Sequence, residues 1–263
     1  MAARISGSVA LVTGSARGIG KAVAARLAED GHDIALNDIA ANKDQLEETA
    51  AEIRAKGVKV TTAIADVSVE AEVKAMVDKV ATDLGALNVM ISNAGIARVE
   101  SLLETSVEAW DNMMGVNLRG TFLCYKTAAE QMIKQGTGGK IIGAASIVAY
   151  RPFALLSPYS ASKWGVRGLT QGAAMEWAKH KITVNAYCPG IVGTAMWELI
   201  DEKLAKEEGL PKGEAIKKYS EAILLGRVSV PEDIGKLASY LAGPDSDYMT
   251  GQCVLIDGGI QFS

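Results

Sequence analysis

The sequence predicts a single α/β domain of the doubly wound kind, a seven-stranded parallel sheet with helices on both faces. Short apolar runs alternate strictly with longer amphipathic stretches, a pattern typical of parallel sheets whose connecting helices cover both faces. The length of 263 residues suits one large domain. No linker rich in Pro, Gly or Ser and no internal repeat divides the chain.

The strands are predicted from short runs in which β-branched and other apolar residues dominate. They begin with VALVT and DIALN, and the full set is 9–13, 33–37, 58–65, 87–92, 139–146, 182–188 and 252–256. Amphipathic patterns between them predict helices at 20–30, 42–56, 69–84, 107–135, 158–179 and 231–242. A charged, helical insert at 195–225 interrupts the alternation. We expect it to form a lid over a substrate, because inserts after strand ends wall the sites of such sheets.

Composition and charge exclude several classes of protein. The net charge of −4 and the pI near 5.4 disfavour nucleic-acid and anionic-membrane partners. Cys124, Cys188 and Cys253 do not indicate a disulfide framework, and Cys188 is interpreted as a small core residue. With His32 and His180 as the only histidines, we expect neither a metal centre nor a histidine-based triad. The apolar run at the start is too short for a secretion signal or a membrane span, so we expect a cytoplasmic location.

A glycine-rich turn between the first strand and the first helix predicts a dinucleotide site. Gly14, Gly18 and Gly20 in TGSARGIG let the backbone approach a pyrophosphate at a helix N-terminus, although a tight strand-to-helix connection has the same pattern. Asp38 ends the second strand about twenty residues later, where a carboxylate accepts the hydroxyls of an adenosine ribose and repels a 2′-phosphate. This favours NAD, while Arg17 in the turn keeps NADP as an alternative.

A tyrosine and a lysine four residues apart, in SPYSASK, indicate acid–base chemistry. Tyr159 and Lys163 share one face of the predicted helix, and three small residues between them leave space for a ligand. A free phenol has a pKa of about 10 and a nearby ammonium stabilises its anion, so we expect Lys163 to lower the pKa of Tyr159. An isolated pair of this kind also fits a surface helix with no such role. The glycine turn, together with Ser146 at the end of the fifth strand, favours catalysis.

Several motifs resemble, in the same order and over essentially the whole chain, those of the short-chain dehydrogenases/reductases. They are TGSARGIG, ADV at 65–67, SNAG at 92–95, Asn117 in GVNLRGTF, Ser146, YSASK at 159–163 and CPGIVGT at 188–194. Ser92 departs from the asparagine that is more common in that family. The resemblance implies a Rossmann-type enzyme that moves a hydride between a nicotinamide and a carbonyl or alcohol carbon, without a metal.

The resemblance also implies a role for each site residue. Tyr159 donates a proton to a carbonyl oxygen or accepts one from an alcohol, and Ser146 hydrogen-bonds that oxygen. Lys163 lowers the tyrosine pKa and holds the nicotinamide ribose, and Asn117 connects the lysine to a water chain. The implied cofactor-binding residues are Gly14, Arg17, Gly18, Ile19, Gly20, Asp38, Ile39, Asp66, Val67, Asn93, Ala94, Gly95, Tyr159, Lys163, Pro189, Gly190, Val192, Thr194 and Met196.

The predicted substrate pocket suits a short neutral ketone. Its walls are mostly apolar, and the nearest basic residue, Arg151, is interpreted as a solvated loop charge. GIVGTAMWELIDEKLAK, LGRVSVPEDI and SDYMTGQCVLIDGG are similar to the acetoin/diacetyl reductase and 2,3-butanediol dehydrogenase subgroup. The alternatives are a reductase of another ketone, of a ketose or of a 3-oxoacyl thioester, and a regulator that senses NADH without turnover. The predicted lining residues are Ser146, Ile147, Val148, Met196 and Trp197, of which Trp197 is either a pocket wall or a lid anchor.

The helix predicted at 158–179 carries more apolar surface than one side of a sheet requires. Leu169, Ala173, Met175 and Trp177 contribute that surface. In the resembling family this helix and the one before it pack against a second subunit, and the last strand joins another contact. The resemblance therefore implies a homotetramer with two-fold interfaces.

Overall fold

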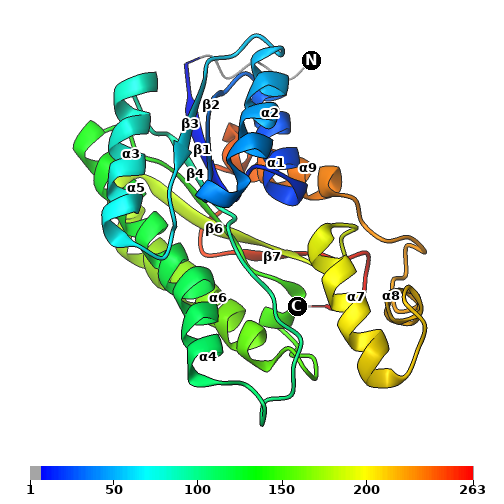
Figure 1. The fold of residues 1–263 in the computed structure, drawn as a ribbon. Helices are drawn as coiled ribbons and strands as arrows, with labels where there is room; N and C mark the ends of the chain where they lie inside the picture. Colours follow the sequence, from blue (N-terminus) through cyan, green and yellow to red (C-terminus); the bar gives the residue numbers. More distant parts are fainter. Residues whose placement is uncertain (1–6, 263) are drawn as a thin grey trace.

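Seven parallel strands form one sheet in the order β3-β2-β1-β4-β5-β6-β7 (Figure 1). The computed structural model describes residues 7–262. The strands are β1 Val9–Thr13, β2 Asp33–Asp38, β3 Val60–Ile64, β4 Val89–Ser92, β5 Gly139–Ala144, β6 Ile182–Pro189 and β7 Cys253–Ile256. The strand order reverses between β1 and β4, and ligands of such sheets bind at this point, beyond the carboxyl ends of the strands. The predicted doubly wound sheet is confirmed.

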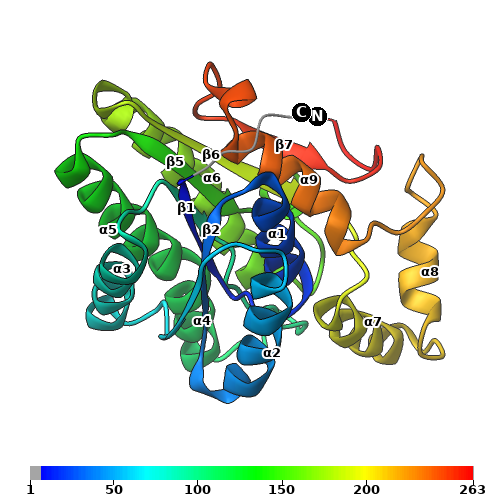
Figure 2. The ribbon, with the colours of Figure 1, turned by 90° about the horizontal axis from the view of Figure 1, so that it is seen from above.

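Helices cover both faces of the sheet, as Figures 1 and 2 show. On one face lie α1 Gly18–Asp30, α2 Lys43–Arg54 and α9 Pro231–Ala242. On the other lie α3 Glu70–Leu84, α5 Gly120–Gln135 and α6 Ser157–Trp177, with α4 Val107–Met114 beside α6. A buried apolar cluster fills each interface between helices and sheet. The predicted insert forms α7 Ala195–Glu208 and α8 Glu214–Ser220, which lie outside both layers after the end of β6.

The segment 107–135, predicted as a single helix, is divided by a π-helical turn. α4 ends at Met114, the turn spans Gly115–Arg119, and α5 begins at Gly120. A π turn adds a residue to the helical repeat and occurs frequently at functional sites. The amphipathic pattern runs through the turn without a break, which is why periodicity did not reveal it. The turn carries Asn117, whose side chain is fully buried.

The apolar residues predicted to form surplus surface on α6 do not all face outward. Leu169, Ala173 and Trp177 are spaced by four residues, so they share the face that packs against the core beneath the helix. Only Met175 of that predicted set is strongly exposed, at 85%. Trp164 of α6 and Phe122 and Ile133 of α5 are also exposed on this side of the molecule.

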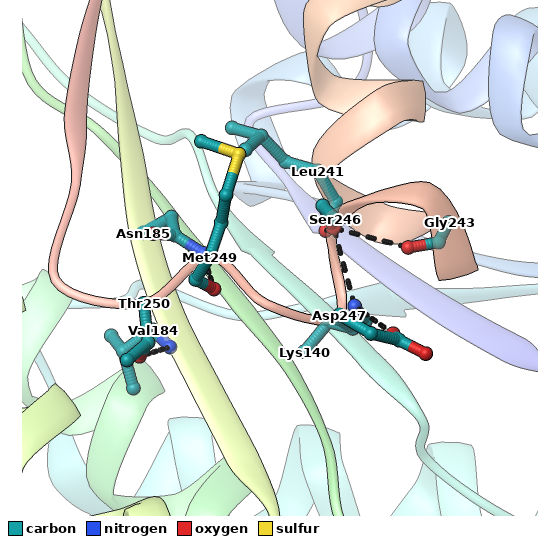
Figure 3. Close-up of polar contacts among 9 residues, drawn as sticks. All are labelled: Lys140, Val184, Asn185, Leu241, Gly243, Ser246, Asp247, Met249 and Thr250. Carbon is teal, nitrogen blue, oxygen red and sulfur yellow. Dashed lines mark hydrogen bonds and ion pairs between the residues drawn. The ribbon is translucent and has the colours of Figure 1, made fainter.

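The connection from α9 to β7 is held against the sheet by side-chain hydrogen bonds (Figure 3). Buried Asn185 of β6 donates to the Met249 carbonyl at 2.9 Å and accepts from the backbone of Gln252 at 3.0 Å. The Thr250 hydroxyl accepts from the backbone of Val184 at 3.1 Å, and Lys140 of β5 pairs with Asp247 at 2.6 Å. The bonds of Asn185 and Thr250 satisfy backbone groups of β6 and of the connection, and together with the ion pair they hold the chain that enters β7 beside β6.

Two further findings bear on the class of protein. Within residues 7–262, no helix is long and apolar enough to span a bilayer. All three cysteines are buried and free, and Cys188 packs with Val166 and Ala186 in a small core cluster, as predicted.

Candidate active site

The turn between β1 and α1 requires glycine at particular positions. Gly14 and Gly18 have φ angles of +62° and +58°, a region that other residues rarely adopt. A Cβ on Gly20 would lie 2.2 Å from the Gly14 carbonyl oxygen, and a Cβ on Gly14 would lie 2.9 Å from Ala94 Cα. Within the described residues, the N-cap Arg17 makes no side-chain capping bond and the first turn of α1 holds no acidic residue. The first backbone amides of α1 are therefore available to an anion.

Asp38 ends β2 with its carboxylate directed at the glycine turn. One oxygen accepts from the backbone of Ala16 at 3.0 Å, and the other accepts from Ile39 N at 2.9 Å and Asn42 Nδ2 at 2.7 Å. A carboxylate has about four acceptor positions, so these contacts leave one for a ligand hydroxyl. Asn42 must therefore turn away before Asp38 can accept both hydroxyls of a ribose.

A network of hydrogen bonds joins the ends of β1 and β4. The Thr13 hydroxyl accepts from the backbone of Asn93 and of Ala94, each at 3.0 Å, and Asn93 Nδ2 donates to the Thr13 carbonyl at 2.9 Å. Fully buried Tyr187 of β6 extends this network by donating to Asn93 Oδ1 at 2.9 Å. The predicted cofactor residues 93–95 are thereby held beside the glycine turn.

Ser146, Tyr159 and Lys163 meet beyond the end of β5. Ser146 Oγ accepts from the backbone of Val148 at 3.3 Å, which leaves its hydroxyl proton free to donate. Tyr159 lies in the first turn of α6 and Lys163 lies one turn later, with Nζ 5.5 Å from the centre of the tyrosine ring. Lys163 Nζ donates to the Ala144 carbonyl at 2.7 Å. Helical spacing and the end of one strand thus bring these three groups together.

Burial sets the charge state of the pair. Desolvation raises the pKa of Tyr159 to about 12, although its hydrogen bond with Ser146 acts in the opposite direction. Desolvation also lowers the pKa of Lys163 to about 8. The sequence predicted that Lys163 would lower the pKa of Tyr159, but the pKa is raised, and loss of hydration is the largest cause of that shift. The phenol is held neutral at physiological pH.

Asn117 reaches the same place from the π turn. Its Oδ1 accepts from the backbone of Ile96 at 2.8 Å, and its Nδ2 donates to the Ile96 carbonyl at 2.9 Å and to Ser162 Oγ at 3.1 Å. A Cβ on Gly95 would lie 3.3 Å from Asn117 Oδ1 and 3.5 Å from Lys163 Nζ. The bare glycine therefore lets the amide and the ammonium flank one small space.

The other predicted site residues follow the ends of the same strands. Arg17 and Ile39 are exposed, whereas Val67, Ile147 and Val148 are buried. A Cβ on Gly18 would lie 3.7 Å from Thr194 Cγ2, so the loop after β6 closes on the glycine turn. Met196 and Trp197 of α7 pack with Tyr159 in one apolar cluster. The rest of the predicted set lies at or beyond the carboxyl ends of β1, β3 and β6, with Ile19 in the first turn of α1 and Pro189 as the last residue of β6: Ile19, Asp66, Pro189, Gly190 and Val192.

A family profile described as short chain dehydrogenase matches residues 8–205. The chain belongs to the short-chain dehydrogenase family. The resemblance found in the motifs is therefore confirmed, and the chain is an oxidoreductase that acts on a small molecule.

Several short-chain dehydrogenases match over nearly their whole length. One of Armillaria gallica is 48% identical over 256 residues, with 97% of each chain covered. An L-2,3-butanediol dehydrogenase of Corynebacterium glutamicum is 46% identical, over 97% of this chain and 99% of that protein. A diacetyl reductase, (S)-acetoin forming, of Staphylococcus epidermidis is 44% identical, over 96% and 98%. The crystal structure of a short-chain type dehydrogenase/reductase from Mycobacterium marinum superposes with a TM-score of 0.87 at 35% identity, over 97% and 96%.

Membership of the short-chain dehydrogenase family, together with dehydrogenase relatives, implies a nicotinamide cofactor. The residues present fit such a group. The uncapped N-terminus of α1 suits a pyrophosphate, the bare glycines allow close approach, and Asp38 retains an acceptor position for a ribose.

Sequence reasoning missed three residues that shape the site. Asn42 holds the Asp38 carboxylate, Thr13 orients Asn93 and Ala94, and Tyr187 fixes the Asn93 amide. The threonine before the first glycine of the turn was a usable signal. Asn42 and Tyr187 gave none, because their partners are distant in the sequence or depend on the path of a loop.

Proposed function

We propose that this short-chain dehydrogenase is an NAD(H)-dependent reductase of small ketones, which reduces diacetyl and acetoin and oxidises 2,3-butanediol in reverse. The observation that supports ketone reduction as the reaction class is the arrangement of four side chains beside the glycine turn, those of Ser146, Tyr159, Lys163 and Asn117. The butanediol dehydrogenase and the diacetyl reductase that match over nearly the whole chain support the choice of substrate.

In the reduction, Tyr159 acts as the general acid. When bound, the nicotinamide supplies a hydride to the carbonyl carbon, or accepts one in reverse. The hydroxyl of Ser146 stabilises, by donating a hydrogen bond, the charge that develops on the carbonyl oxygen. Tyr159 then transfers its proton to that oxygen, and an alkoxide is a strong enough base to take it from a phenol whose pKa is about 12. Oxidation requires the phenolate and releases a proton, so it is favoured by higher pH.

Lys163 and Asn117 return the proton to Tyr159. With a pKa near 8, Lys163 gains and loses a proton readily around neutral pH. The space that it shares with Asn117 beside Gly95 suits a water that continues the route toward solvent. Asn117 is fully buried and bonded on both sides of its amide, so it holds that route in one geometry.

Asp38 supports the choice of NAD over NADP. Asp38→Ala is expected to raise the ratio of kcat/KM with NADPH to that with NADH by about tenfold or more, because a like-charge contact with the 2′-phosphate disappears. Asp44→Ala is the matched control, since it removes an exposed carboxylate from α2. Steady-state kinetics with both cofactors measure the ratio. A parent enzyme that prefers NADPH contradicts the assignment, and Arg17 then becomes the residue that selects the phosphate.

The insert supports a compact, neutral substrate. α7 brings Met196 and Trp197 into one apolar cluster with Tyr159, and Trp197 therefore serves as a wall of the substrate site. Arg151 is exposed, as expected for a solvated loop charge. A small ketone fits this enclosure, and a second oxygen beside the carbonyl eases hydride attack by withdrawing electrons.

A substrate panel tests the proposal. We expect kcat/KM with NADH to be highest for diacetyl and acetoin among four substrates, the other two being a ketose and an acetoacetyl thioester. A lead of about tenfold or more for either of those overturns the substrate and leaves the reaction class standing. Tight NADH binding without turnover of any ketone overturns the reaction class in favour of a regulator.

We also propose that the enzyme is a homotetramer. Phe122 of α5 and Trp164 and Met175 of α6 leave apolar area in water, which a neighbouring subunit would cover. Light scattering at micromolar concentration is expected to give four times the mass of the chain. A monomer under these conditions contradicts the proposal.

A further inference from the structure

A buried carboxylate links the two helices of the insert. Asp201 lies in the middle of α7 with only 4% of its surface exposed. One of its oxygens accepts from the backbone of Gly213 at 2.6 Å, and the other accepts from the backbone of Ile216 at 2.7 Å. A carboxylate is costly to bury unless strong donors surround it, and both oxygens here are engaged by the start of α8.

α8 depends on this partner because it cannot cap itself. It has seven residues, fewer than an isolated helix needs to be stable in water. Gly213, at its N-cap, has a φ of +93° and no side chain to accept from the first amides. Asp201 supplies from α7 the acceptor that the local sequence lacks. The exposed contacts of Glu208 with Lys218 and Tyr219 form a second link, of the surface kind that contributes little.

α7 and α8 each make a contact in the region around the catalytic tyrosine. α7 packs Met196, Trp197 and Ile200 into the cluster that contains Tyr159. α8 sets Tyr219 edge-on against Phe153, with ring centres 6.4 Å apart and planes at 78°. Phe153 lies in the segment between Ser146 and Tyr159. A change in the angle between the two helices therefore moves the walls of the substrate site.

We propose that Asp201 is a positioning residue that sets the width of the substrate site. By capping α8, it holds Tyr219 against Phe153 and keeps Met196 and Trp197 closed over Tyr159. The enzyme thereby selects short ketones over bulky ones. This inference rests on the proposed ketone reductase function.

The experiment compares Asp201→Asn and Asp201→Ala with the parent, using a short ketone and a bulkier one that carries a branched side chain. Asparagine keeps one acceptor and alanine keeps none. We expect Asp201→Ala to raise KM for the short ketone by about tenfold, Asp201→Asn to fall between it and the parent, and kcat to change by less than about threefold in both. The bulky-to-short ratio of kcat/KM should rise in the same order, and NADH affinity should stay that of the parent.

Glu202→Gln is the matched control, because it removes the neighbouring exposed carboxylate and its ion pair with Lys212. Hydrogen exchange reports the link without turnover: the amides of 213–220 should lose protection in Asp201→Asn while those of β5 and β6 keep theirs. Parent-like KM, selectivity and protection in Asp201→Asn overturn the proposal, as do equal effects in Glu202→Gln. If the parent turns over no ketone, the proposed function fails, whereas the exchange result still decides whether Asp201 holds α8. If Asp201→Ala fails to fold, the asparagine variant alone carries both tests.

Discussion

Tyr159→Phe is expected to lower kcat by on the order of a thousandfold or more while NADH still binds. The substitution removes one hydroxyl and keeps the ring that packs with Met196 and Trp197. The proton donor disappears, and so does the hydrogen bond between Tyr159 and Ser146. Steady-state kinetics with diacetyl and a direct NADH titration measure the two effects separately.

Tyr150→Phe is the matched control for this prediction. It removes a neighbouring phenol that donates to the Cys253 carbonyl and stacks against Arg167. Turnover should remain within about threefold of the parent, since the hydroxyl that is removed bonds to the backbone of Cys253 in β7. Normal turnover in Tyr159→Phe contradicts the proposed mechanism, and loss of NADH binding assigns the tyrosine to cofactor binding instead.

Lys163→Met is expected to abolish most activity and to stabilise the protein. Methionine keeps most of the apolar stem, while the buried ammonium and its bond to the Ala144 carbonyl are lost. The pKa of Lys163 falls from 10.5 to about 8 on burial, so the folded state resists the charge. After allowance for the lost hydrogen bond, we expect a gain of about 1–3 kcal/mol in the free energy of unfolding at neutral pH. Denaturant titration of the cofactor-free protein measures it.

The gain should depend on pH in a defined direction. Below about pH 8 the lysine is charged in both states, and the parent bears the full cost of burying it. Between about pH 8 and 10.5 the folded state has released the proton that the unfolded chain still binds, so the stability of the parent rises toward that of the variant. The raised pKa of Tyr159 acts in the opposite direction above its ordinary value of 10, but it is present in both proteins and cancels in the comparison. Equal stability at pH 7 contradicts the prediction.

The sequence by itself determined the architecture and the order of the site. Alternating apolar and amphipathic segments report local geometry, and in a parallel sheet that alternation leaves one arrangement that covers both faces. The glycine spacing around Gly14 and the four-residue interval from Tyr159 to Lys163 are equally local, because a turn and a helix face are defined within a few residues. The motif order then identified the family, and the family profile confirmed it.

The tertiary structure alone decided what depends on distant neighbours. The π turn places Asn117 beside Ile96 and Ser162, although nothing in its own segment breaks the helical pattern. The direction of the pKa shift at Tyr159 follows from burial, which the spacing to Lys163 cannot reveal. In the sequence, Asp201 is one acidic residue among many in a charged helix. Only the tertiary structure shows that its carboxylate accepts from backbone groups at the start of α8. Hydration and hydrogen-bond partners are properties of the packed chain, and sequence periodicity carries no information about which remote group supplies them.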